Sequence, residues 1–188
     1  KYIDEAINST SDPSELIEFK LMKIMFLRNQ KNIASAFDVY NTLNQDQLTL
    51  SQKYNLFLLH MDNDDCNTAL NFGEKLFLDL EQDISTSMNL LSEFAFNLAA
   101  CSNHKADVKY NKIIEYMGDV ENHSKEFTNQ YIELCNEIKE LYSSAKDYYR
   151  LSLDYDEKSN PMTKDLKRKM RKNIRKIDDT IIPTLLEL

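Results

Sequence analysis

The stretch D-C-N-T-A-L-N-F-G-E-K-L-F, residues 65–77, decides how the rest of the chain is interpreted. Ala69 and Gly73 are four positions apart and Leu76 follows three positions later, so on a helix all three lie on one face. The distance between packed helices depends on the side chains at their contact, and small ones allow a close approach. The stretch therefore predicts a helix that packs tightly against a neighbour.

The same spacing occurs three more times along the chain. It is found at Ala36, Tyr40 and Leu43, at Ala106, Tyr110 and Ile113, and at Ala145, Tyr149 and Ser152. The alanines thus recur at positions 36, 69, 106 and 145. Their interval is close to the period of about 34 residues that is typical of a helical solenoid built from paired helices. We therefore predict an all-α protein, an antiparallel helix-pair solenoid without a β-sheet.

Composition and helix-capping residues agree with this fold class and suggest where the helices lie. The 188 residues include only two glycines and three prolines, fewer than strands joined by tight turns usually need. Asp12 before Pro13, and Thr49 three residues before Gln52, are typical helix starts. We expect one helical-repeat domain over 1–188, with helix pairs at about 13–44, 49–82 and 85–118. Residues 125–156 contain no helix breaker and form a long helix or a fourth pair, of which we favour the long helix.

The last predicted helix, residues 161–182, is strongly basic on one side. Residues 162–176 hold eight Lys or Arg and one Asp, whereas the rest of the chain holds 15 basic and 30 acidic residues. The formal net charge of -8 argues against a general nucleic-acid binder. The predicted basic face consists of Lys164, Lys167, Arg168, Arg171, Lys172 and Arg175, with Lys169 and Lys176 beside them. Two interpretations stay open: the helix caps the solenoid and docks on its acidic surface, or it binds an acidic partner or RNA. We favour the first, since a solenoid needs an end cap with a polar outer face.

On these motifs the chain resembles the tetratricopeptide repeat family, over roughly residues 13–118. That family places a small residue, an aromatic and a second small residue at steps of four and three on the second helix of each pair. The positions that match are Ala36, Tyr40 and Leu43, then Ala69, Gly73 and Leu76, and the Asn-Leu pairs at 55–56 and 97–98 are similar to one on the family's first helix. The first-helix aromatic position falls on Lys20 and Lys53, and the small one on Ile24 and Phe57, which departs from the family. Related helix-pair solenoids remain an alternative.

The resemblance implies a superhelix whose first helices line a concave surface, on which partners, often extended peptides, bind. The residues predicted to face this partner-binding groove are Tyr54, Leu58 and Met61 in the second pair and Asn89, Glu93 and Asn97 in the third. The asparagines suit this role because an amide both donates to and accepts from a peptide backbone. For Leu58 and Met61, burial in the core is the alternative.

No motif for catalysis, a cofactor or a metal is found in the sequence. His60, His104 and His123 have no nucleophile or acid at a recognised catalytic spacing. The acidic run that follows His60 lacks the glycine of a calcium loop, so we expect it to be an inter-helix loop in which Asp64 or Asp65 caps the next helix. Three unpaired cysteines favour a reducing, intracellular and cytoplasmic location, with the nucleus as an alternative. No apolar run reaches the ~20 residues of a membrane span.

These observations predict a non-enzymatic protein–protein interaction scaffold, a segment of a larger protein that binds a partner peptide or subunit. One alternative is a ligand- or peptide-sensing repeat domain of a regulatory protein. Another is a ribonucleoprotein component that uses its basic C-terminal helix. An enzyme is not expected.

Overall fold

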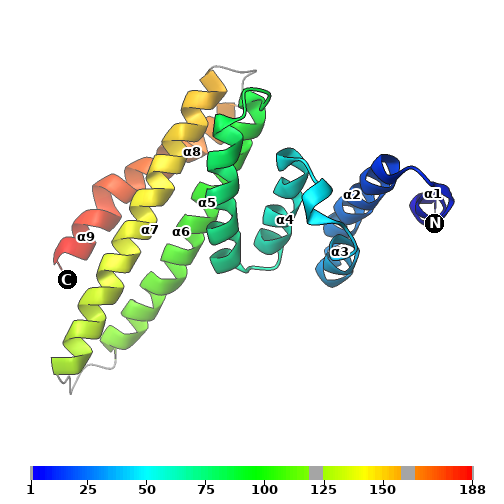
Figure 1. Cartoon of the computed structure of the whole chain (residues 1–188). Helices are drawn as coiled ribbons and strands as arrows, with labels where there is room; N and C mark the ends of the chain where they lie inside the picture. The colour runs from blue at the N-terminus through cyan, green and yellow to red at the C-terminus, as the bar shows by residue number, and fades with distance from the viewer. Residues whose placement is uncertain (1, 119–124, 158–163, 188) are drawn as a thin grey trace. The chain divides into compact units, whose positions relative to one another are not determined.

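The computed structural model describes residues 2–118, 125–157 and 164–187, and every regular element among them is helical (Figure 1). The all-α prediction is confirmed. Contacts between residues divide the chain into two compact units, residues 1–83 and 84–188.

The first unit contains two helical hairpins preceded by a short helix. Its elements are α1 (Tyr2–Ser9), α2 (Pro13–Asn29), α3 (Ile33–Tyr40), the 3-10 turn η1 (Gln45–Gln47), α4 (Leu50–Asp62) and α5 (Cys66–Gln82). The predicted helix starts are observed: the Asp12 carboxylate accepts the Ser14 N–H at 2.8 Å, and Thr49 and Gln52 form a reciprocal capping box. Backbone N–H groups without a helical partner are thereby satisfied at both helix starts.

The two hairpins are closed by the same turn. Lys31 and Asp64 are the non-glycine residues with positive φ in the described chain, at 57° and 54°. Each follows the end of a helix, and the next N–H reaches back to a carbonyl five residues earlier, from Asn32 to Leu27 and from Asp65 to His60. This is the Schellman arrangement. Asn32 and Asp65 then cap α3 and α5, so one residue ends the turn and starts the next helix.

The first helices of the two hairpins, α2 and α4, lie side by side and are joined by two polar contacts. Gln52 donates to Glu18 at 2.8 Å, and Arg28 donates to Asp62 at 2.6 Å, each pair being 34 residues apart. Beneath these contacts a core is formed by buried residues of the first hairpin and α4, among them Leu21, Ile24, Ala36, Tyr40 and Leu59. The period found in the sequence is thus also the spacing of contacts in this unit.

The second unit consists of long helices rather than short pairs. Its elements are α6 (Met88–Gly118), α7 (Lys125–Glu157), α8 (Lys164–Lys176), the π-turn η2 (Ile177–Ile181) and α9 (Ile182–Glu187). The prediction of two helices within 85–118 is wrong, because α6 continues without a turn from Met88 to Gly118. No glycine or proline interrupts residues 88–117. Ser102 is buried and the Asn103 amide bonds Asp107 on the next turn, so tertiary packing overrides the weak helix propensity there.

Residues 125–157 form one helix, α7, so the long helix is the alternative that is observed. The C-terminal segment also departs from a simple helix. Pro183 lacks an N–H and its ring would collide with the carbonyl four residues before it in an α-helix. The π-turn before it widens the helix, with the Ile182 N–H bonded to the Ile177 carbonyl, and α9 continues beyond. The predicted start at Pro161 lies outside the described residues.

The α7 helix is the centre of the second unit and contacts both α6 and the α8–α9 segment (Figure 1). At the contact with α6, the hydroxyls of Ser92 and Ser152 each donate to the other residue's carbonyl at 2.8 Å. Residues from all three segments share one core, including Ala106 of α6, Ala145 of α7 and Ile177 of the π-turn.

The first prediction concerns Ala69, which is fully buried. We expect Ala69→Leu to lower the free energy of unfolding by about 1–3 kcal/mol, because extra methylenes in a packed contact force neighbours apart. Urea denaturation of both proteins measures the difference. Asn71→Leu, which places the same side chain at an exposed position of α5, is the control and should be nearly neutral. Equal effects of the two changes would show that the wrong face of α5 has been taken as buried.

Candidate partner-binding surfaces

The six residues predicted to line a groove fall in two different units. Tyr54, Leu58 and Met61 lie on α4, whereas Asn89, Glu93 and Asn97 lie on α6. The expected exposure of Tyr54 is wrong: it is 6% exposed, and its ring stacks on Phe57 with centroids 5.7 Å apart. An aromatic pair of this kind stabilises the fold, so Tyr54 is a core residue.

The remaining groove residues are only partly accessible. Leu58 and Met61 are half-buried, so they are neither clear core nor clear surface. On α6, Asn89 and Glu93 are exposed and Asn97 is half-buried. Their four-residue spacing places these three on one side of the helix, as the sequence predicted. The partner-binding role of this polar row stays a prediction.

The helix α8 is oriented by contacts on its inner side. Met170 is fully buried and packs with Ala99 and Tyr149, which come from α6 and α7. On one flank of this apolar side the Lys167 ammonium pairs with the buried carboxylate of Asp156. On the other flank the Asn173 amide donates to the Tyr149 hydroxyl at 3.0 Å. Burial raises the pKa of that hydroxyl, which remains protonated. Two polar contacts and one apolar stripe therefore fix the rotation of α8 about its axis.

The π-turn after α8 is held to α7 by a second ionic contact. Lys146 donates to Asp178 at 2.8 Å, and Arg150 approaches the other oxygen of that carboxylate at 3.6 Å. In this contact the acidic group is on the C-terminal segment and the basic groups are on α7, the reverse of the predicted docking. Of the predicted basic face, Lys167 is the residue that pairs with a described acidic group. Lys167, predicted to belong to the outward basic face, turns inward instead, because its position lies next to the apolar stripe.

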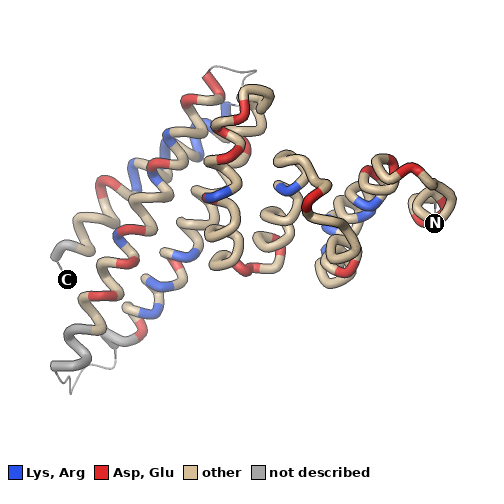
Figure 2. Tube along the Cα trace, in the orientation of Figure 1, with Lys and Arg blue, Asp and Glu red and all other residues tan. Residues whose placement is uncertain are grey.

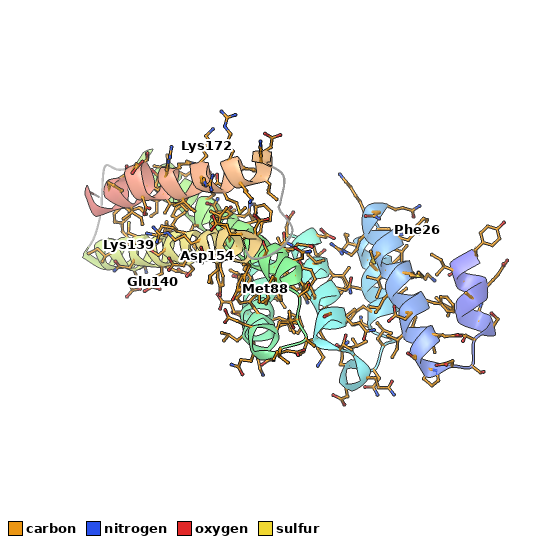
Figure 3. All side chains as sticks on the ribbon, turned by 90° about the horizontal axis from the view of Figure 1, so that it is seen from above. Phe26, Met88, Lys139, Glu140, Asp154 and Lys172 are labelled. Carbon is orange, nitrogen blue, oxygen red and sulfur yellow. The ribbon has the colours of Figure 1, made fainter. Side chains whose placement is uncertain are left out.

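The other predicted basic residues of α8 all point to solvent. Lys164, Arg168, Arg171, Lys172 and Arg175 are exposed, and none makes an ion pair with a carboxylate in the part of the chain that the structure describes. We call these five residues the α8 basic face. Their spacings of three and four residues place them on one side of the helix. Figure 2 shows the positive charge gathered along α8, and Figure 3 shows Lys172 pointing away from α7.

The acidic run after His60 is used by the hairpin turn. The Asp62 carboxylate accepts from Arg28, and the Asp65 carboxylate accepts the Thr68 N–H at 3.1 Å as the cap of α5. Hydrogen bonds from the Thr68 side chain and backbone lower the pKa of Asp65 below its ordinary value. Of the two predicted capping residues, Asp65 is the one observed. Over residues 2–118, 125–157 and 164–187, no three His, Cys, Asp or Glu side chains stand close enough to hold a metal ion.

A feature that sequence reasoning missed is an apolar patch on α2. Met22, Met25 and Phe26 are each about half exposed, at 55%, 52% and 51%. Apolar residues occur on nearly all sides of this helix, a pattern that predicts burial between neighbours. The three-residue and four-residue steps from Met22 to Met25 and Phe26 carry a signal for one common face, but no sequence signal says that this face lacks a neighbour.

Similarity to known proteins does not identify the chain. No protein-family model, curated protein or solved structure matches it. No helix in the described ranges combines the length and the apolar character that crossing a bilayer requires.

The second prediction compares two lysines of α8. Lys167→Met should lower the free energy of unfolding by roughly 2–4 kcal/mol, because it leaves the buried Asp156 carboxylate without its cation. Lys172→Met makes the same change on the exposed side and should alter stability by less than about 0.5 kcal/mol. Chemical denaturation measures both. Similar values for the two would mean that the Lys167–Asp156 pair does not hold α8 in place.

The third prediction concerns pH and the cap of α5. Because the folded-state pKa of Asp65 is lowered, its carboxylate contributes stability above the ordinary pKa of about 3.9 and loses that contribution as the pH falls through the lowered value. Asp65→Asn keeps a good cap without the charge, so it should be less stable than wild type at pH 7 by under about 1 kcal/mol. The difference, measured by denaturation at several pH values, should disappear near pH 2. A difference that is constant with pH would contradict this assignment.

Proposed function

We propose that this chain is a non-enzymatic interaction scaffold that recognises an anionic macromolecular partner through the α8 basic face. The observation that carries the proposal is that the basic residues of α8 have two different environments. Lys167 pairs with the buried Asp156, whereas the five residues of the basic face are exposed and form no ion pair with a described carboxylate. Like charges three or four residues apart on a helix repel. An anionic partner bound to this face would neutralise the charges and remove their repulsion.

A scaffold of the helical-repeat type is supported by the first unit. Its two hairpins have equivalent turns at Lys31 and Asp64, and α2 and α4 are linked by two polar contacts, each between residues 34 apart. These features are consistent with the resemblance to tetratricopeptide repeats over residues 13–82. In the second unit, α6 and α7 are much longer than the helices of such repeats. We therefore restrict the resemblance to the first unit.

The fourth prediction tests whether the basic face is a contact surface. The basic-face variant carries Arg168, Arg171, Lys172 and Arg175 changed to Gln. We expect it to lose the partners that immobilised wild-type protein captures from an extract of its source cells at about 50 mM salt. Capture by wild type should also fall steeply when the salt concentration is raised. The melting temperature should stay within about 2 °C of wild type, because the four side chains are exposed.

The matched control variant removes four lysines away from α8: Lys53, Lys75, Lys105 and Lys112, each changed to Gln. It lowers the net charge by the same amount and should keep the wild-type partners. If the basic-face variant retains every partner, the proposed function is wrong. If it instead melts well below wild type, the face serves folding, and the intramolecular interpretation is correct.

A further inference from the structure

We infer that the α8 basic face binds an acidic helix of a partner protein, rather than a nucleic acid or a membrane. This inference rests on the proposed function and names the class of partner for the same surface. It follows from the length of the face, its boundaries and the side chains that it lacks.

The face has the length and period of a helix. From Lys164, the cations Arg168, Arg171 and Arg175 follow at offsets of 4, 7 and 11, which span about 17 Å at a rise of about 1.5 Å for each position. Carboxylates at the same offsets on a second helix repeat with the same spacing, so each finds a cation opposite. Three of these four cations are arginines, whose planar guanidinium groups bond carboxylates with two hydrogen bonds.

Acidic residues follow the C-terminal end of the face. Asp179 is exposed just beyond α8, next to Asp178, and Asp165 is exposed in the first turn, beside Lys164. A DNA or RNA duplex is a long anion, with one phosphate per ~1.7 Å of axis in B-form DNA, and it continues past a face of this length. Phosphates beyond the C-terminal end would then lie near Asp178 and Asp179. A short acidic helix that ends opposite Arg175 avoids that repulsion.

The face also lacks the side chains that the other partners need. Single-stranded nucleic acids are bound largely by stacking bases on aromatic rings. Residues 164–176 contain no aromatic residue. Helices that bind membranes insert apolar side chains into the bilayer. The apolar residues of α8 are not on the basic face: Met170 is fully buried, and Leu166 and Ile174 pack in the same cluster against α6 and α7.

The test uses two synthetic helical peptides of one composition, measured by fluorescence anisotropy with the full chain. The aligned peptide has glutamates at offsets 0, 4, 7 and 11, and the scattered peptide distributes the same glutamates around the helix. Circular dichroism confirms equal helicity. Because an exposed ion pair changes an equilibrium constant by a factor of about two, four pairs should make the aligned peptide bind about tenfold tighter. The basic-face variant should lose this preference, and the control variant at Lys53, Lys75, Lys105 and Lys112 should keep it.

The other partner classes are tested in the same buffer with a single-stranded RNA, an RNA duplex and vesicles containing phosphatidylserine. The inference is overturned if any of these binds the basic face more tightly than the aligned peptide, or if the two peptides bind equally. In either case the proposed function stands as long as capture from the extract still depends on the basic face. If that capture does not depend on it, the proposed function fails, and the inference fails with it.

Discussion

The close contact between α6 and α7 is the interaction on which the second unit depends. Ser92 and Ser152 exchange hydrogen bonds from hydroxyl to carbonyl at 2.8 Å, and both residues are buried. A helical serine often donates to a carbonyl of its own helix, but here each hydroxyl donates to a backbone carbonyl of the other helix. Because the serine side chain is short, the two backbones must lie close together. Ala99, Ala106 and Ala145 are fully buried in the same pair of helices and leave the space that such an approach needs. Bulkier residues at these three alanine positions would separate α6 and α7, the two helices against which α8 packs.

The position of α8 follows from that contact and determines the candidate site. The helix places Met170 against Ala99 and Tyr149, and the polar contacts of Lys167 and Asn173 lie on either side. Once these inner positions are occupied, the rotation of α8 is fixed and its outward residues are fixed as well. The backbone that carries the basic face is therefore held in place, so a partner orders only its side chains on binding.

The small-residue spacing predicted much of this structure. Ala36, Ala69, Ala106 and Ala145 were singled out from spacing alone, and all four are fully buried. The continuity of α6 could not be predicted, because the burial of Ser102 and the hydrogen bond from Asn103 to Asp107 are not visible in the sequence. The exposure of Tyr54 and the outward position of Lys167 were wrong for a similar reason. Tyr54 stacks on Phe57 one turn along its own helix, and Lys167 pairs with Asp156 on another helix. Sequence periodicity does not reveal which neighbour such a side chain contacts.

The acidic residues that the structure describes do not neutralise the basic face of α8. Residues other than 162–176 hold twice as many acidic as basic groups, and Glu140, Asp147 and Asp154 on α7 are exposed in the same unit. At physiological ionic strength, exposed charges more than about 8 Å apart are largely screened from each other. General negative charge elsewhere therefore does not replace an ion pair at the basic face. The fold itself pairs Lys167 with Asp156 and leaves the outward cations to solvent ions. An acidic helix would displace those ions and align its carboxylates with the row from Lys164 to Arg175, whose spacing α8 already holds rigid.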